Sequence, residues 1–296
     1  MCGLAGFFSY SSDAPSVNRS ALLRMRESMS LRGPDGQGLW LSSDGRMGLA
    51  HRRLAIIDLS ENGAQPMASA DGASVVLADI NPAGAAIAKE IGGLFVHADL
   101  ALRADCRALA DAALAASGTV HILINNAGFQ HIAPIADFPE DVWEQMQAVM
   151  LTAPFLLTRY LWPAMQANGW GRIVNISSIH GLVASLHKAG YIAAKHGLIG
   201  LTRTSALEGG ACGITANAIC PAFVRTPLVA NQIAALAKTR GISEAEVLEK
   251  VILDSAAIKR LIEPEEVADL AAYLCSAGAG AITGAALTMD LGWTAR

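Results

Sequence analysis

Three residues in the middle of the chain, Ser178, Tyr191 and Lys195, have types and spacing suited to proton transfer. Residues 171–178 read as a short buried strand that ends at Ser178, and a helix is predicted from Lys188 onward. On that helix Tyr191 and Lys195 stand at positions i and i+4, so the phenol and the ammonium share a face. A neighbouring cation favours the phenolate and lowers the pKa of a tyrosine. The three residues therefore predict a site where a tyrosine acts as acid or base.

Taken alone, the Tyr191–Lys195 pair also fits an ordinary amphipathic helix whose lysine reaches solvent. The surrounding sequence favours the site, because apolar strands and helices alternate from Ala73 onward. Strands are expected at 74–79, 94–99, 120–125, 172–177, 214–220 and 286–290, and helices at 82–91, 102–116, 141–165, 188–207 and 264–276. This alternation predicts an α/β fold, a doubly wound parallel sheet covered on both faces. Ligands of such sheets bind beyond the carboxyl ends of the strands, where Ser178 falls.

The composition excludes several classes of protein. The 296 residues are 52% hydrophobic and 16% charged, with a mean hydropathy of +0.37, which indicates a substantial core. A net charge of −4 and a pI near 6.0 give no basic surface for nucleic acid or anionic lipid, so a small molecule is the expected partner. Five cysteines without a Cys-x-x-Cys pair argue against disulfides and a metal site. No apolar run is long enough for a membrane and no signal peptide is recognisable, which favours the cytoplasm.

Residues 1–67 differ in character from the rest of the chain. A strand at 4–8, a helix-like stretch at 21–29, a Gly/Pro turn at 32–36 and a hairpin at 38–51 that reverses at Asp44-Gly45 predict a small α+β fragment. The segments 1–6, 32–36 and 51–58 resemble the opening of class II glutamine amidotransferase domains of the asparagine synthetase type.

That resemblance implies that Cys2 becomes an N-terminal nucleophile after removal of Met1, and that Arg53 holds the carboxylate of glutamine. It ends near Asp71, and the Asn-Gly-Glu strand that supplies the family's oxyanion hole does not follow. Oxyanion donors contribute several kcal/mol to such reactions. We therefore interpret residues 1–71 as a truncated amidotransferase-like fragment.

Residues 72–296 resemble the short-chain dehydrogenase/reductase family at 125–128, Ser178, 191–195 and 221–227. The resemblance implies a Rossmann-like fold in which Tyr191 is the general acid/base, Ser178 bonds the substrate oxygen, and Lys195 binds the nicotinamide ribose and lowers the pKa of Tyr191. It also implies a cofactor site formed by Asp79, Asp99, Asn125, Ala127, Gly128, Tyr191, Lys195, Pro221, Val224 and Thr226.

Asp79 bears on the choice of cofactor. In the family, an acidic residue at this place accepts from the adenosine ribose hydroxyls and repels a 2′-phosphate, which favours NAD over NADP. The alternative for Asp79 is a helix N-cap before Pro82.

One branch of the family, the D-3-hydroxybutyrate dehydrogenases, is similar at 128–134, 180–185 and 292–296. This similarity implies that four residues bind the carboxylate of a short 3-hydroxy acid, namely Gln130, His180, Lys188 and Gln232. Lys188 also lies one helical turn before Tyr191, close enough to neutralise an acid whose hydroxyl reaches the phenol. Singly, each of the four also fits a surface or loop position.

Three departures from the family pattern predict impaired activity. The opening strand and its Thr-Gly-x-x-x-Gly-x-Gly turn, whose amides hold the pyrophosphate, have no counterpart before Ser74. Met150 stands where the family usually has an asparagine that anchors a water of the proton relay, and a thioether is a weak acceptor. Ala222 and Leu291 replace glycines at tight backbone positions.

The sequence therefore predicts a chimera of residues 1–71 and a truncated dehydrogenase at 72–296 that uses NAD to oxidise D-3-hydroxybutyrate or a similar acid. Two alternatives stay open: hydrolysis of glutamine by Cys2, and a non-catalytic subunit that joins complete partners through the expected helices 141–165 and 188–207. The resemblance also implies a homo-oligomer, commonly a tetramer.

Overall fold

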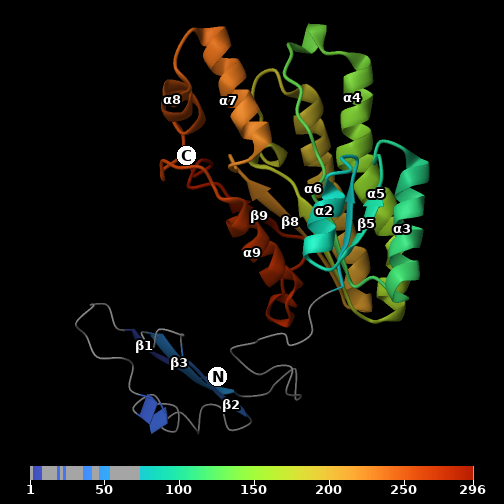
Figure 1. Ribbon diagram of the computed structural model, residues 1–296, viewed down its shortest axis with the longest axis vertical. Helices are drawn as coiled ribbons and strands as arrows, with labels where there is room; N and C mark the ends of the chain where they lie inside the picture. The colour runs from blue at the N-terminus through green and yellow to red at the C-terminus, as the bar shows by residue number, and fades with distance from the viewer. Residues whose placement is uncertain are drawn as a thin grey trace. The chain divides into compact units, whose positions relative to one another are not determined.

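The computed structural model describes residues 3–8, 19–20, 23–24, 36–41, 47–53 and 74–295 (Figure 1), without the side chains of its N-terminal strands and of residues 228, 235, 239 and 240. The chain divides into two compact units, Met1–Ala73 and Ser74–Arg296. Each unit is described by itself.

The N-terminal unit contains a three-stranded antiparallel sheet in the order β1-β3-β2. Its strands are β1 (Gly3–Phe8), β2 (Gly36–Leu41) and β3 (Met47–Arg53), and β2 and β3 form the predicted hairpin. The reversal at 44–45, the turn at 32–35, most of 21–29 and Cys2 lie outside the described residues, as does the side chain of Arg53. Glutamine hydrolysis by Cys2 therefore stays a prediction.

The second unit alternates strands and helices, which confirms the α/β class. Its strands are β4 (Val76–Asp79), β5 (Leu94–His97), β6 (Ile122–Asn125), β7 (Gly171–Ile176), β8 (Ile214–Pro221) and β9 (Ala286–Met289), and all pairings between them are parallel. Its helices are α2 (Gly84–Glu90), α3 (Arg103–Ser117), α4 (Glu140–Gln147), α5 (Ala153–Ala167), α6 (Ala189–Gly209), α7 (Pro227–Arg240), α8 (Glu244–Val247) and α9 (Pro264–Cys275). Within the described part of the chain, no helix combines the length and apolarity needed to cross a membrane.

Two helical regions differ from the prediction. The single helix expected at 141–165 is divided into α4 and α5 by a π-helical turn at Ala148–Thr152. Because Pro154 has no N–H, the carbonyl of Met150 lacks its α-helical partner there. Helices α7 and α8 were not predicted, although Pro227 at the start of α7 and Gly241 at its end are typical helix boundaries.

The parallel strands of the second unit form two sheets rather than one. One sheet pairs β4 with β5, and the other has the order β6-β7-β8-β9. Among the described residues, neither β4 nor β6 pairs with a strand on its other edge. Strands β7 and β8 are buried on both faces, between α5 and α6 on one side and α9 on the other (Figure 1).

Strand β6 departs from the expected coverage. Leu123 and Asn125 are buried, but Ile122 and Ile124 are 39% and 48% exposed. Leu123 packs within the cluster that includes α5, whereas the opposite face of β6 carries the two exposed isoleucines. The prediction that helices cover both faces of the sheet is therefore wrong at β6.

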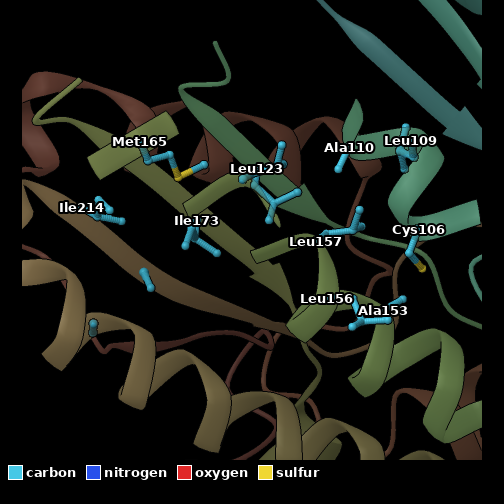
Figure 2. Packing of buried hydrophobic residues seen from close by; sticks show 13 residues of the cluster. Cys106, Leu109, Ala110, Leu123, Ala153, Leu156, Leu157, Met165, Ile173 and Ile214 are labelled. Atoms are coloured by element: carbon cyan, nitrogen blue, oxygen red, sulfur yellow. The ribbon is translucent and has the colours of Figure 1, made fainter. Parts of the chain in front are cut away.

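The largest buried cluster joins the second sheet to α3 and α5 (Figure 2). Leu123, Ile173 and Ile214 extend from β6, β7 and β8. Leu156 and Leu157 of α5 belong to the same cluster, as do Cys106, Leu109 and Ala110 of α3. This packing fixes β7, whose carboxyl end leads directly to Ser178.

Truncating Ile173, which is 1% exposed, should lower the free energy of unfolding. We expect Ile173→Ala to cost about 2–5 kcal/mol, because it removes buried apolar atoms and leaves a cavity. Ile135→Ala is the matched control, since Ile135 is 84% exposed and should change stability by less than about 0.5 kcal/mol. Urea unfolding measures both, and equal effects would contradict the assigned core.

Candidate active site

A cavity of about 260 Å³ lies at the carboxyl ends of β7 and β8 and is lined by Ser178, Tyr191 and Lys195. All four residues expected to bind a substrate carboxylate line it too: Gln130, His180, Lys188 and Gln232. Of the residues expected to bind the cofactor, Gly128, Pro221, Val224 and Thr226 join the lining, whereas Asp79, Asp99, Asn125 and Ala127 do not. The fold thus brings together residues as far apart in the sequence as Gln130 and Gln232.

Ser178 is held where β7 turns into a short 3₁₀ helix, Ile179–Gly181. Its hydroxyl oxygen accepts a hydrogen bond from the backbone N–H of His180 at 3.1 Å, and it lies 3.5 Å from the carbonyl oxygen of Pro221. The side chain also hydrogen-bonds the phenol of Tyr191. Ser178 is therefore oriented by both neighbouring strands and faces the phenol, as the sequence predicts.

Tyr191 and Lys195 both lie on α6, with the Lys195 ammonium 5.5 Å from the centre of the Tyr191 ring. Burial raises the pKa of Tyr191, and its hydrogen bond with Ser178 only partly offsets this effect. Burial also lowers the pKa of Lys195 to about 8. Desolvation is the largest cause at Tyr191 and sets the upward direction, and the lowering of this pKa by Lys195 stays a prediction. The phenol keeps its proton at neutral pH.

Lys188 and His180 form a buried pair on one side of the cavity. The Lys188 ammonium lies 3.1 Å from Nε2 of His180, which Ser185 Oγ also approaches at 3.3 Å. The two side chains are 9% and 5% exposed. Burial, followed by the charge of Lys188, lowers the pKa of His180 to about 4, and burial lowers the pKa of Lys188 as well. The imidazole is thus neutral and can accept from the ammonium.

Two aromatic rings lie beside the Lys188–His180 pair. Phe223 lines the cavity, and its ring centre is 5.8 Å from the Lys188 ammonium. Trp293 places its ring 6.3 Å from that of His180. The sequence analysis gave neither residue a role, although Phe223 follows Pro221 by only two positions. An apolar wall beside a buried ammonium suits a short chain that carries an anionic end.

Two carboxylates expected at the cofactor are engaged in local turns. Asp79 Oδ1 accepts from the N–H of Asn81 at 2.7 Å, and Asp99 Oδ1 accepts from the N–H of Ala101 at 2.9 Å. Helix α2 has Ala83 as its N-cap, so the alternative that Asp79 is an N-cap is wrong. Asp79 instead closes a turn, and it is exposed at the end of β4.

The three departures from the family pattern have different structural consequences. Met150 is fully buried in an apolar cluster with Met146 and Ala194 and offers only a thioether. Leu291 has a φ of 56°, which is strained for a branched residue. Ala222 is outside the set of residues with positive φ, so its side chain fits without backbone strain.

The residues of the cavity fit the nicotinamide end of a dinucleotide. Lys195 donates to the carbonyl of Ile176 at 2.7 Å, and an ammonium has two further N–H groups to offer ribose hydroxyls. Gly128 lies close by, since a Cβ there would be 3.7 Å from the Lys195 ammonium and 3.2 Å from Met150 Sδ. Asp79, which is expected at the adenosine end, is exposed at the end of β4. In the same part of the chain, no cluster of His, Cys, Asp or Glu suits a metal ion.

Comparisons with known proteins match two parts of the chain. A family model described as enoyl-(acyl carrier protein) reductase matches residues 62–294, and one described as a glutamine amidotransferase domain matches residues 1–98. The chain belongs to the short-chain dehydrogenase/reductase family of oxidoreductases and carries an amidotransferase-like segment at its start.

Several relatives share most of the second unit. An uncharacterized oxidoreductase of Bacillus subtilis is 43% identical over 76% of this chain and 90% of its own length. D-beta-hydroxybutyrate dehydrogenase of Cupriavidus necator is 40% identical over 77% of this chain and 91% of its own length. The protein of that name from Rhizobium meliloti is 50% identical over 60% of this chain and 69% of its own length.

The buried His180 should make stability depend on pH. Its pKa is about 4 in the folded chain and 6.5 ordinarily, so the unfolded chain binds more protons between these values. The contribution of His180 to the free energy of unfolding is complete above pH 6.5. It falls by up to about 3 kcal/mol as the pH drops towards 4. The free energy of unfolding, measured across this pH range for the wild type and His180→Asn, should change less steeply with pH in the variant. Identical slopes would contradict a neutral, buried His180.

Proposed function

We propose that residues 72–296 form an NAD-dependent dehydrogenase that oxidises D-3-hydroxybutyrate, or a similar short 3-hydroxy acid, to the 3-oxo acid. One observation carries the proposal. The Lys188 ammonium is 9% exposed, faces the same cavity as Tyr191, and has the neutral His180 as its hydrogen-bond partner. A buried cation beside a neutral partner favours an anionic ligand, since a charge-assisted bond offsets the cost of its desolvation.

The size of the cavity supports a small acid. Its volume of about 260 Å³ is below the roughly 300–1,000 Å³ of pockets for drug-sized ligands. Gln130 and Gln232 line the cavity with Lys188 and supply amide donors for a carboxylate. The names of the relatives from Cupriavidus necator and Rhizobium meliloti point to the same substrate.

In the proposed reaction the substrate hydroxyl lies between Ser178 and Tyr191. The Tyr191 phenolate takes the hydroxyl proton, and the Ser178 hydroxyl donates to the oxygen as it becomes a carbonyl. Lys195 holds the nicotinamide ribose and stabilises the phenolate by its charge. A bound nicotinamide cofactor supplies the acceptor for the hydride that leaves C3. Because burial raises the pKa of Tyr191, oxidation should be faster at alkaline pH.

Asp79 supports the choice of NAD. Its carboxylate is exposed at the carboxyl end of β4 and would repel a 2′-phosphate. We infer that NAD binds weakly, because the sequence carries no Gly-rich turn before β4 to hold the pyrophosphate. We also propose that the chain forms a homo-oligomer, which by resemblance to the family is a tetramer.

Turnover of D-3-hydroxybutyrate tests the proposal through the phenol of Tyr191. We expect NADH to form in the wild type, and Tyr191→Phe to reduce the rate by about 10²–10⁴-fold because the proton acceptor is lost. Absorbance of NADH measures the rate. Tyr273→Phe is the matched control, since Tyr273 is 49% exposed on α9 and should leave the rate unchanged. Equal rates for wild type and Tyr191→Phe would contradict the proposed chemistry.

The role of Lys188 is tested by comparing D-3-hydroxybutyrate with its methyl ester. The wild type should prefer the acid, and Lys188→Met should raise KM for the acid by about 10- to 100-fold, the loss of one charge-assisted bond. KM for the ester should change little, so the preference disappears. Lys89→Met on the exposed part of α2 is the control. An unchanged preference for the acid in Lys188→Met would rule out the carboxylate site.

A further inference from the structure

The end of β7 is bonded to α6 by three consecutive residues. The side-chain amide of Asn175 donates to Thr202 Oγ1 at 2.8 Å. The carbonyl of Ile176 accepts from the Lys195 ammonium at 2.7 Å, and the hydroxyl of Ser177 donates to the carbonyl of Lys195 at 3.1 Å. The next residue along the chain is Ser178, just beyond the end of β7. Residues 175–177, which contact α6, therefore directly precede Ser178 of the candidate active site.

Thr202 lies on the stripe of α6 that faces the sheet. Lys195, Leu198 and Thr202 are spaced i, i+3 and i+7, which places them on one face of a helix, and they are 3%, 1% and 0% exposed. The Thr202 hydroxyl donates to the carbonyl of Leu198 at 2.7 Å, so its oxygen is left to accept from Asn175. This arrangement fixes which end of the Asn175 amide faces α6.

The fixed amide continues the chain of hydrogen bonds to β6. Because the amide nitrogen of Asn175 faces Thr202, its oxygen faces the other way and accepts from the side-chain amide of Asn125 at 2.8 Å. Asn125 and Asn175 are 8% and 1% exposed. In a dry interior an unpaired amide is costly, so the three side chains hold a single arrangement.

The turn after β7 approaches α6 very closely. A Cβ at Gly181 would lie 2.6 Å from Ser177 Oγ, 2.8 Å from Ile199 Cδ1 and 2.9 Å from the carbonyl oxygen of Lys195. No side chain fits at Gly181 without moving the turn away from the helix. Small displacements of α6 are therefore transmitted to the turn that carries Ser178 and His180.

We propose that Thr202, together with Asn175, is a positioning residue that sets α6 along β7 and so keeps the Tyr191 phenol within hydrogen-bond reach of Ser178. Thr202 is eleven residues from Tyr191 on the same helix and does not line the cavity. Its effect passes through the helix. The proposal rests on the proposed function only for its activity readout.

Thr202→Val tests this role, because it keeps the shape of the side chain but leaves the Asn175 amide without its acceptor. We expect kcat to fall about tenfold, as small misplacements of reacting groups slow catalysis. The pH–rate profile should also move to higher pH, since the bond from Ser178 lowers the pKa of Tyr191. Thr202→Ser should restore both. Thr204→Val is the matched control: Thr204 makes the same kind of bond, to the carbonyl of Gly200 at 3.2 Å, but is exposed.

A second readout needs neither cofactor nor substrate. The phenol of Tyr191 is titrated by ultraviolet difference spectroscopy, with Tyr191→Phe as the blank, in the wild type, Thr202→Val and Thr204→Val. A rise of the Tyr191 pKa in Thr202→Val, but not in Thr204→Val, supports the positioning role. This holds even if the wild type turns over no substrate, because the lack of turnover would refute only the proposed function. A Thr202→Val protein that melts at a lower temperature but keeps the wild-type titration would overturn the positioning role.

Discussion

The contact between the Lys195 ammonium and the carbonyl of Ile176, 2.7 Å long, is the interaction on which the rest of the site depends. Lys195 is 3% exposed, and a buried cation is stable only when its N–H groups find acceptors. That requirement draws α6 onto the end of β7. With α6 in this position, the Tyr191 phenol lies next to Ser178 and lines the cavity at the carboxyl ends of β7 and β8.

A second buried cation gives the cavity its direction. Lys188 is the N-cap residue of α6, about one turn before Tyr191, and its neighbour His180 is neutral because burial disfavours the charged imidazole. In the proposed function, the Tyr191 end of the cavity transfers the proton and the Lys188 end binds the carboxylate of the substrate.

The sequence predicted the strongly patterned parts of this structure. Strand β7 and helix α6 lie within a few residues of their expected bounds, and the seven residues expected to react with or bind substrate line one cavity. The positions were predictable because a buried strand and a long helix impose local patterns, and because motif spacing places residues at one edge of a sheet, whereas the roles of the seven residues stay predictions.

Other features depend on contacts that no local pattern encodes. The raised pKa of Tyr191 follows from burial by distant segments, which a helical spacing of phenol and lysine does not report. The division into two sheets follows from which strands lie side by side, and the strands of both sheets have the same apolar pattern. Helix α7 was missed because its boundary signals, Pro227 and Gly241, enclose a stretch with weak helical periodicity.

The division of the chain bears on how the proposed cofactor is bound. Residues 1–98 match a glutamine amidotransferase model and residues 62–294 a reductase model, and the sheet of the second unit is divided between β4 and β6. The cavity proposed to receive the nicotinamide is lined by residues of α6 and of the ends of β7 and β8, which pair with each other in the second sheet. The residues proposed for the reaction therefore share one cavity, although Met150 replaces the expected relay asparagine, whereas the sequence carries no Gly-rich turn before β4 for the pyrophosphate.

Calorimetric titration of the full chain with NAD tests this account most directly. We expect saturable binding with a dissociation constant in the millimolar range, weakened further in Lys195→Met, because the ribose of the nicotinamide half loses its donor. The absence of any binding at millimolar NAD, in a sample whose folding is verified by circular dichroism, would contradict the claim that this cavity receives a nicotinamide cofactor.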